Sequence, residues 1–276
     1  MSYSCEIEIV GDTVIRRPPS GEGIFPRYDL ALEARVINAV SVPAPAPATF
    51  ADGALTMPFV AGPIPKDFTP LDPWLNGLPD DAARRRVWES TIDTIAAIHR
   101  EALLPGLRTG LAAELDYWSD YLDWIGNAPP PGLVDAFAWC RDHAPIATEP
   151  EPVLLWGDVR FGNIVYDEAT LTPKAVLDWE MVSAGPREMD IAWLTALDEV
   201  GRELSGMSVS GFGTRADAIA RFGDPLVDFD WYETFALVRA SAISTRIAVL
   251  HERAGTRSAF KVGDDPTLKA ALSRIS

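Results

Sequence analysis

Three short apolar runs, at residues 153–156, 164–166 and 175–177, stand between polar segments of the chain. Runs of this length, bounded by turn-forming residues, predict buried strands. The second and third runs are joined by residues 167–173, which are rich in turn formers. The pattern predicts a strand-loop-strand-turn-strand unit, with polar side chains gathered at one end of a small sheet.

The start of the chain also reads as strands. Residues 5–9 alternate apolar and acidic side chains, which predicts a half-buried strand, and a Gly-Asp turn at 11–12 leads to a second strand at 13–16. Residues 54–60 are strand-like but contain Pro58. Because proline cannot sit inside a paired central strand, we expect the pairing to be interrupted there.

Beyond residue 80 the chain reads as mostly helical. One apolar stripe contains Trp88, Ile92, Ile95 and His99, another contains Leu115, Trp118, Leu122 and Ile125, and residues 188–200 and 231–250 add two helices. His99 ends an apolar stripe, so we interpret it as a structural, partly buried histidine.

The composition, net charge and cysteine count of the chain argue against several classes of protein. The 276 residues are 47% hydrophobic with nine Trp, as expected for a folded globular protein. A net charge of −16 argues against binding to a nucleic-acid backbone, which needs a basic face. The sequence predicts no signal peptide and no membrane span, so we expect a cytoplasmic protein. Two cysteines, without a C-x-x-C pair, indicate neither a disulfide framework nor a structural zinc.

Asp158, Asn163 and Asp178 carry the candidate chemistry, in the loop after the first predicted strand and at the end of the third. Phosphoryl transfer to a hydroxyl needs a carboxylate for the hydroxyl proton and hard oxygen ligands for magnesium. Asp158 suits the first role, and Asn163 and Asp178 suit the second. The sequence has no P-loop and no G-x-S-x-G motif. The G-x-G-x-x-A pattern at 211–216 lacks a preceding strand, so we interpret it as a flexible connection.

Two segments carry a resemblance to a known family. The stretches LLWGDVRFGNIVYD at 154–167 and AVLDWEMVSAGPREMDIAWL at 175–194 resemble the catalytic region of the aminoglycoside phosphotransferase and choline kinase-like superfamily. The chain especially resembles the branch related to the kinase domains of certain acyl-CoA dehydrogenase family proteins. Further matches lie at residues 14–19, in the helix around Glu33 and at residues 228–232. The resemblance implies a two-lobed, protein-kinase-like α+β fold, ATP with GTP as an option, Mg²⁺, and a small-molecule hydroxyl as acceptor.

Carried over by position, the resemblance makes Asp158 the catalytic base, with Asn163 and Asp178 as the magnesium ligands. Arg16 takes the place of the phosphate-binding lysine. Glu33 matches the helix glutamate that holds that cation.

The same comparison places the adenine-binding hinge at residues 57–60. It assigns nucleotide contacts to Met57, Pro58 and Val60. The physical argument agrees in part, because a strand interrupted at Pro58 leaves the Pro58 carbonyl and the Val60 N–H free for the adenine edge. The alternative is a simple strand end.

The chain departs from the family pattern at three places. Trp156 stands where the family has histidine, and an indole N–H can still donate one hydrogen bond. Arg16 replaces lysine, and its planar fork can pair with phosphate and carboxylate. Only fifteen residues precede Arg16, so we expect the first strand of the small lobe to be missing and residues 2–4 to be what remains of the phosphate loop. Either an upstream start or a lost lid would explain this.

These observations predict a small nucleotide-binding lobe at 1–61 and a helical catalytic and acceptor lobe at 62–276.

Asp190, which follows Gly-Pro-Arg-Glu, is expected to interact with free N–H groups at a helix start, and the resemblance marks it as a support of the catalytic loop. The leading hypothesis is an ATP- and Mg²⁺-dependent small-molecule kinase. A catalytically impaired nucleotide-binding or scaffold protein and a metal-dependent hydrolase are the alternatives.

Overall fold

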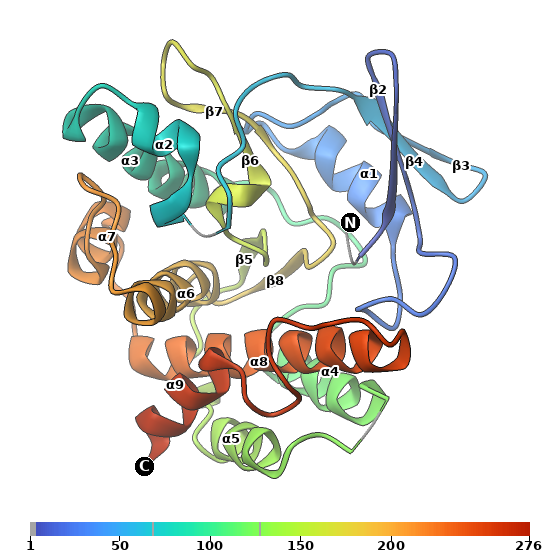
Figure 1. The fold of residues 1–276 in the computed structure, drawn as a ribbon, viewed down its shortest axis with the longest axis vertical. Helices are drawn as coiled ribbons and strands as arrows, with labels where there is room; N and C mark the ends of the chain where they lie inside the picture. Colours follow the sequence, from blue (N-terminus) through green and yellow to red (C-terminus); the bar gives the residue numbers. More distant parts are fainter. Residues whose placement is uncertain (1–3, 68, 127) are drawn as a thin grey trace.

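The computed structural model describes residues 4–67, 69–126 and 128–276. Its N-terminal part is an antiparallel sheet of four described strands in the order β1-β2-β4-β3, with helix α1 packed against β3 and β4 (Figure 1). The bounds are β1 Glu6–Val10, β2 Thr13–Arg17, β3 Thr49–Ala51, β4 Ala54–Pro58 and α1 Leu30–Ala39. Of the phosphate-loop remnant expected at 2–4, Ser4 is buried, and residues 2 and 3 lie outside the described residues.

The alternating pattern at residues 5–9 predicted strand β1 correctly but not its burial. Ile7 and Ile9 are 53% and 57% exposed, so the expectation of a half-buried strand is wrong. The reason is the position of β1 at the edge of the sheet, whereas α1 packs at the opposite end of the sheet. Alternation in a sequence identifies a strand but does not identify what covers its apolar face.

The rest of the chain is mostly helical. The described helices are α2 Pro73–Gly77, α3 Asp81–Ile98, α4 Leu111–Trp124, α5 Pro131–Asp142, α6 Glu188–Ser205, α7 Arg215–Phe222, α8 Phe229–Arg253 and α9 Pro266–Ile275. The long helix α8 contacts α4, α5, α6 and α9 and runs across the lower half of Figure 1. The helices predicted from the two apolar stripes are confirmed as α3 and α4, and those predicted at residues 188–200 and 231–250 are confirmed as α6 and α8. No helix in the described ranges is long and apolar enough to cross a membrane.

The three predicted catalytic strands exist, but they do not form one sheet. β5 (Val153–Leu155) pairs with β8 (Ser183–Gly185), and β6 (Ile164–Tyr166) pairs with β7 (Pro173–Val176), both antiparallel. Strand β8 was not predicted because Ser-Ala-Gly has no apolar alternation. The candidate catalytic loop, residues 156–163, therefore connects two separate two-stranded ladders.

The glycine-rich segment at 211–216 is closely packed, which corrects the expectation of a flexible connection. A Cβ on Gly211, where φ is 87°, would lie 2.4 Å from the Asp81 carbonyl oxygen, and one on Gly213 would lie 2.4 Å from the Trp88 ring. Thr214 then caps α7 in a capping box with Asp217. The glycines serve close approach between elements.

The segment after β4 lies against the β6–β7 ladder. Pro63 O accepts a hydrogen bond from Tyr166 N (2.9 Å), and Ala61 O accepts one from Lys174 Nζ (2.9 Å). A Cβ on Gly62 would lie 2.4 Å from Tyr166 O, so only glycine fits there. The division into lobes at 1–61 and 62–276 stays a prediction.

Candidate active site

Asp158 and Asn163 meet within the loop between β5 and β6. Asp158 Oδ2 accepts hydrogen bonds from Asn163 Nδ2 (2.8 Å) and from Arg160 Nε (2.9 Å). Asn163 lies in a 3₁₀ turn (Phe161–Asn163), and its Nδ2 also donates to the Asp158 backbone carbonyl (3.0 Å). Burial to 8% exposure raises the pKa of Asp158, and Arg160 opposes that rise. The carboxylate is thus held through one oxygen, and it is more basic than an exposed aspartate.

Asp190 fixes the backbone just before Asp158. Its Oδ1 accepts from Gly157 N (2.9 Å), and its Oδ2 accepts from Trp156 N (2.9 Å) and contacts His99 Nε2 (3.0 Å). Asp190 lies in the first turn of α6, as expected, but the N–H groups that it accepts from belong to the loop after β5 and not to the helix start. His99 is buried and follows α3, as its structural interpretation required.

Asp178 is held in a left-handed conformation (φ 58°) directly after the β7 segment. The Trp156 indole N–H donates to Leu177 O (2.9 Å) and approaches Asp178 O (3.3 Å). Leu177 N donates in turn to Asn163 O (2.8 Å). Trp156 therefore supplies the hydrogen-bond donor at the position where the family has histidine, and the two proposed metal ligands are joined through the backbone.

Arg16 links the small sheet to this site. Its Nη1 donates to Glu33 Oε2 (2.8 Å) and its Nη2 to Asp178 Oδ1 (2.9 Å), with Glu180 Oε2 at 3.7 Å. Burial alone would lower the pKa of Arg16, but Asp178 and Glu33 raise it above its ordinary value. Burial raises the pKa of Glu33 to about 7, against the effect of Arg16. Burial and Asp178 raise the pKa of Glu180 well above its ordinary value. The contact with Asp178 was not predicted from the sequence.

The candidate hinge lies at the end of β4. Phe59 N donates to Asp12 O (2.8 Å), so in the antiparallel alternation Pro58 occupies a non-hydrogen-bonded position opposite Thr13. Its backbone polar groups face the β3 side, and β3 begins at Thr49, opposite Thr56, so it does not extend to Pro58. Met57 is buried, and Val60 is partly exposed. The pairing with β2 therefore continues through Pro58, and the expected interruption there is wrong, because no ladder bond to β2 requires the N–H that proline lacks.

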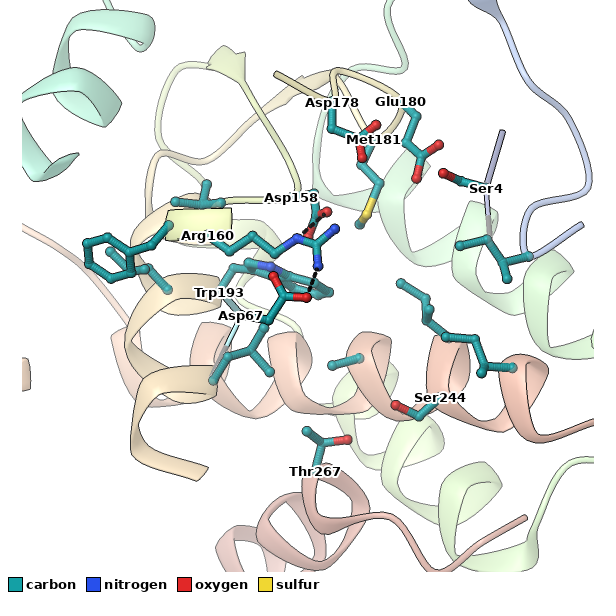
Figure 2. Close-up of a pocket in the computed structure, with 18 of the residues that line it drawn as sticks. Ser4, Asp67, Asp158, Arg160, Asp178, Glu180, Met181, Trp193, Ser244 and Thr267 are labelled. Atoms are coloured by element: carbon teal, nitrogen blue, oxygen red, sulfur yellow. Dashed lines mark hydrogen bonds and ion pairs between the residues drawn. The ribbon is translucent and has the colours of Figure 1, made fainter. Parts of the chain in front are cut away.

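A cavity of about 550 Å³ is lined by Asp158, Asp178 and Glu180. Figure 2 shows Asp158, Arg160 and Asp67 joined on one side of it, with Asp178 and Glu180 close by. Ser244 of α8 and Thr267 of α9 lie across the cavity from these acids (Figure 2). Arg160 Nη1 pairs with Asp67 Oδ2 (3.0 Å) in addition to Asp158. Sequence reasoning missed Asp67, Glu180 and the whole wall from α6 and α8, because a wall of apolar helix residues has the same pattern as a buried core.

A family model described as "Phosphotransferase enzyme family" matches residues 8–232. The chain belongs to this family. Acyl-CoA dehydrogenase family member 11 of Homo sapiens is 24% identical over 196 residues, which are 65% of this chain and 24% of that protein. The chain therefore spans about a quarter of the length of this curated relative.

Solved structures of low sequence identity share the fold. A proposed aminoglycoside phosphotransferase from Ralstonia eutropha JMP134 has a TM-score of 0.71 at 19% identity, covering 99% of this chain and 93% of that one. ADP-bound aminoglycoside phosphotransferase APH(2'')-Ib has a TM-score of 0.57 at 11% identity, covering 98% and 92%. These likenesses confirm the predicted α+β, protein-kinase-like fold.

Proposed function

We propose that this protein transfers the γ-phosphoryl group of ATP, or of GTP, to a hydroxyl of a small molecule in a Mg²⁺-dependent reaction. The observation that supports this most directly is that Asp158, which Asn163 holds by a hydrogen bond, and Asp178, from a separate segment, line the same ligand-sized cavity. Membership of the phosphotransferase family agrees with the proposal.

Asp158 acts as the base in this proposal. Asn163 and Arg160 both donate to its Oδ2, so Oδ1 accepts no hydrogen bond from the described residues and faces no competitor for the acceptor hydroxyl. The bond from the γ-phosphorus to the β–γ bridging oxygen breaks, and a bond from phosphorus to the acceptor oxygen forms. The hydroxyl proton passes to Asp158, and the nucleoside diphosphate leaves.

The residues present fit a magnesium ion. Asn163 donates through its nitrogen and keeps its amide oxygen free of the described residues, and Asp178 adds a carboxylate. Magnesium is commonly held by one or two such side chains together with substrate phosphates and waters, so these two ligands are enough. When bound, the ion would neutralise charge on the phosphates.

Arg16 and the hinge complete the proposed nucleotide site. Glu33 holds one arm of the Arg16 fork, so the other arm, now on Asp178, is positioned for a phosphate oxygen. The Pro58 carbonyl and the Val60 N–H are proposed to bind the adenine edge, and Met57 to pack beside it.

Thermal shift with Mg-ATP and Mg-GTP tests the nucleotide site. At a ligand concentration of about 100 times Kd, wild type should gain about 3 kcal/mol and melt roughly 5 °C higher, because the ligand binds only the folded state. Asp178→Ala should lose the shift. Asp135→Ala, an exposed carboxylate on α5, is the matched control and should keep it.

Turnover separates the kinase from its alternatives. Asp158→Ala should lose acceptor phosphorylation and keep the thermal shift, because the carboxylate acts on the acceptor. Unchanged turnover would refute the assignment of Asp158. A nucleotide shift without turnover would favour the scaffold alternative, and phosphate release that needs no acceptor would favour the hydrolase.

A further inference from the structure

One wall of the cavity, formed by α6 and α8, is mainly apolar. Helix α6 lines it with Leu194 and Leu197, and α8 lines it with Ala240, Ile243 and Ile247, which are spaced along one face of the helix. A hydrocarbon that covers these side chains leaves water and gains about 25 cal/mol for each Å² of apolar surface removed. This wall favours an acceptor with an apolar body.

The carboxylates that line the cavity already have arginine partners. Asp67 pairs with Arg160 (3.0 Å), and Asp198 pairs with Arg202 (2.7 Å). Asp158 also pairs with Arg160, and Asp178 and Glu180 both contact Arg16. An ammonium group on the acceptor would meet carboxylates whose charge an arginine already offsets, and it would leave water beside an apolar wall, which costs free energy.

The cavity lining is equally unsuited to an acceptor with an anionic body. Arg160 is the one cationic side chain among the described lining residues, and its guanidinium bonds Asp158 and Asp67 at the same time. Two neutral hydroxyls, on Ser244 and Thr267, lie across the cavity from the acids (Figure 2). They suit a neutral polar atom at the far end of the acceptor.

We propose that the acceptor is an alcohol whose hydroxyl is attached to an uncharged, mainly hydrocarbon body lying along α6 and α8, and that it is not a polyamine sugar. This inference rests on the proposed phosphoryl transfer, which places the reacting hydroxyl at Asp158. The rest of the acceptor then extends along the apolar wall.

Matched probes test the inference. Binding of n-hexanol, n-octanol and ω-amino-n-octanol is measured by calorimetry with Mg²⁺ and a non-hydrolysable ATP analogue, and ADP release is measured with ATP. Two added methylenes should tighten binding about tenfold from hexanol to octanol. The ammonium derivative, which has the same carbon chain, should bind at least tenfold more weakly than octanol.

Two leucine variants on one helix separate the wall from general effects. Leu197→Glu puts an unpaired carboxylate into the wall, so it should remove the chain-length dependence and shift the preference toward the amino alcohol. Leu204→Glu makes the same substitution at a site that is 58% exposed and outside the cavity lining, and it should behave as wild type. The Mg-nucleotide thermal shift checks that both variants are folded.

Equal or tighter binding of the amino alcohol, tighter binding of an aminoglycoside, or no binding by either series would overturn the inference. The two proposals fail separately. Octanol binding without ADP release above the Asp158→Ala background would refute phosphoryl transfer to this acceptor class while the apolar site stands. Turnover that prefers the amino series would leave the kinase and refute the acceptor class.

Discussion

Asp190→Asn is the most informative single change, because Asp190 holds the catalytic loop without lining the proposed acceptor cavity. The side chain is 1% exposed, and its two oxygens accept from Gly157 N, Trp156 N and His99. Asparagine has nearly the same shape but only one acceptor oxygen. Its NH₂ group must face a donor, whichever way the amide is placed.

The lower-cost placement keeps the oxygen at the Oδ2 position, where two donors converge, and leaves Gly157 N facing the NH₂ group. An unsatisfied buried N–H costs about 1–3 kcal/mol, and loss of the charge on the remaining bonds adds about 1 kcal/mol. The expected destabilisation is about 2–4 kcal/mol out of a typical total of about 5–15. Because Gly157 precedes Asp158, a displacement of about 1 Å there should lower kcat about 100-fold.

Urea unfolding gives the stability change from the midpoint shift multiplied by the m value, and ADP release gives kcat. Asp135→Asn, on the exposed side of α5, is the matched control and should leave both unchanged. Nucleotide affinity should stay within about threefold, because Asp190 contacts the loop and not the proposed phosphate site. A stability loss below about 1 kcal/mol with normal kcat would refute the reasoning.

Three further predictions concern the Trp156 hydrogen bonds, the close packing of Gly157 and the burial of Cys140. Trp156→Phe removes the indole donor to the backbone at Asp178 and should cost about 1–2 kcal/mol of stability and raise KM for Mg-ATP; an unchanged KM would contradict the bracing role. Gly157→Ala places a Cβ 2.4 Å from Met181 O at a φ of 91°, so kcat should fall more than 100-fold, and near-normal turnover would show that the loop can move aside. Burial raises the pKa of the Cys140 thiol to about 12, from 9.0, so folded protein should react with a disulfide reagent at pH 8 only on unfolding. Since this folded pKa lies above the unfolded one, the stabilisation is complete below pH 9 and is lost as pH rises toward 12, which urea titrations at several pH values measure.

The helices were the most predictable part of the fold. The stripes through Trp88 and Trp118 identified α3 and α4, because a helix that buries one face must repeat apolar residues at its own period. Ser183–Gly185 carried no such signal, since a short strand of small residues is defined by its partner β5. The exposure of Ile7 followed from the position of β1 in the sheet, which no local pattern encodes.

The candidate site also contains residues that the sequence indicates and residues that only the structure reveals. Asp158, Asn163 and Asp178 could be proposed from the sequence because phosphoryl transfer restricts residue type and spacing, and their roles stay a prediction. Glu180 could not, since its environment depends on Arg16, which is 164 positions earlier in the chain but only 3.7 Å away in space. The acceptor wall was hidden for a different reason. Residues such as Ile243 line a cavity with the same pattern that buries a core, so only the structure separates the two.

Two of the three departures from the family pattern, Trp156 and Arg16, meet at Asp178. Trp156 holds the backbone of this residue from one side, and Arg16 holds its carboxylate from the other. A histidine at 156 would offer one ring N–H, and the indole of tryptophan offers the same, so the bracing requires a donor and not an imidazole. At position 16 the fork of arginine bonds Glu33 and Asp178 with separate nitrogens, whereas a lysine would serve both from one ammonium. Trp156 and Arg16 therefore keep a hydrogen-bond donor and a cation at these two positions, and together they hold Asp178, whose backbone is left-handed.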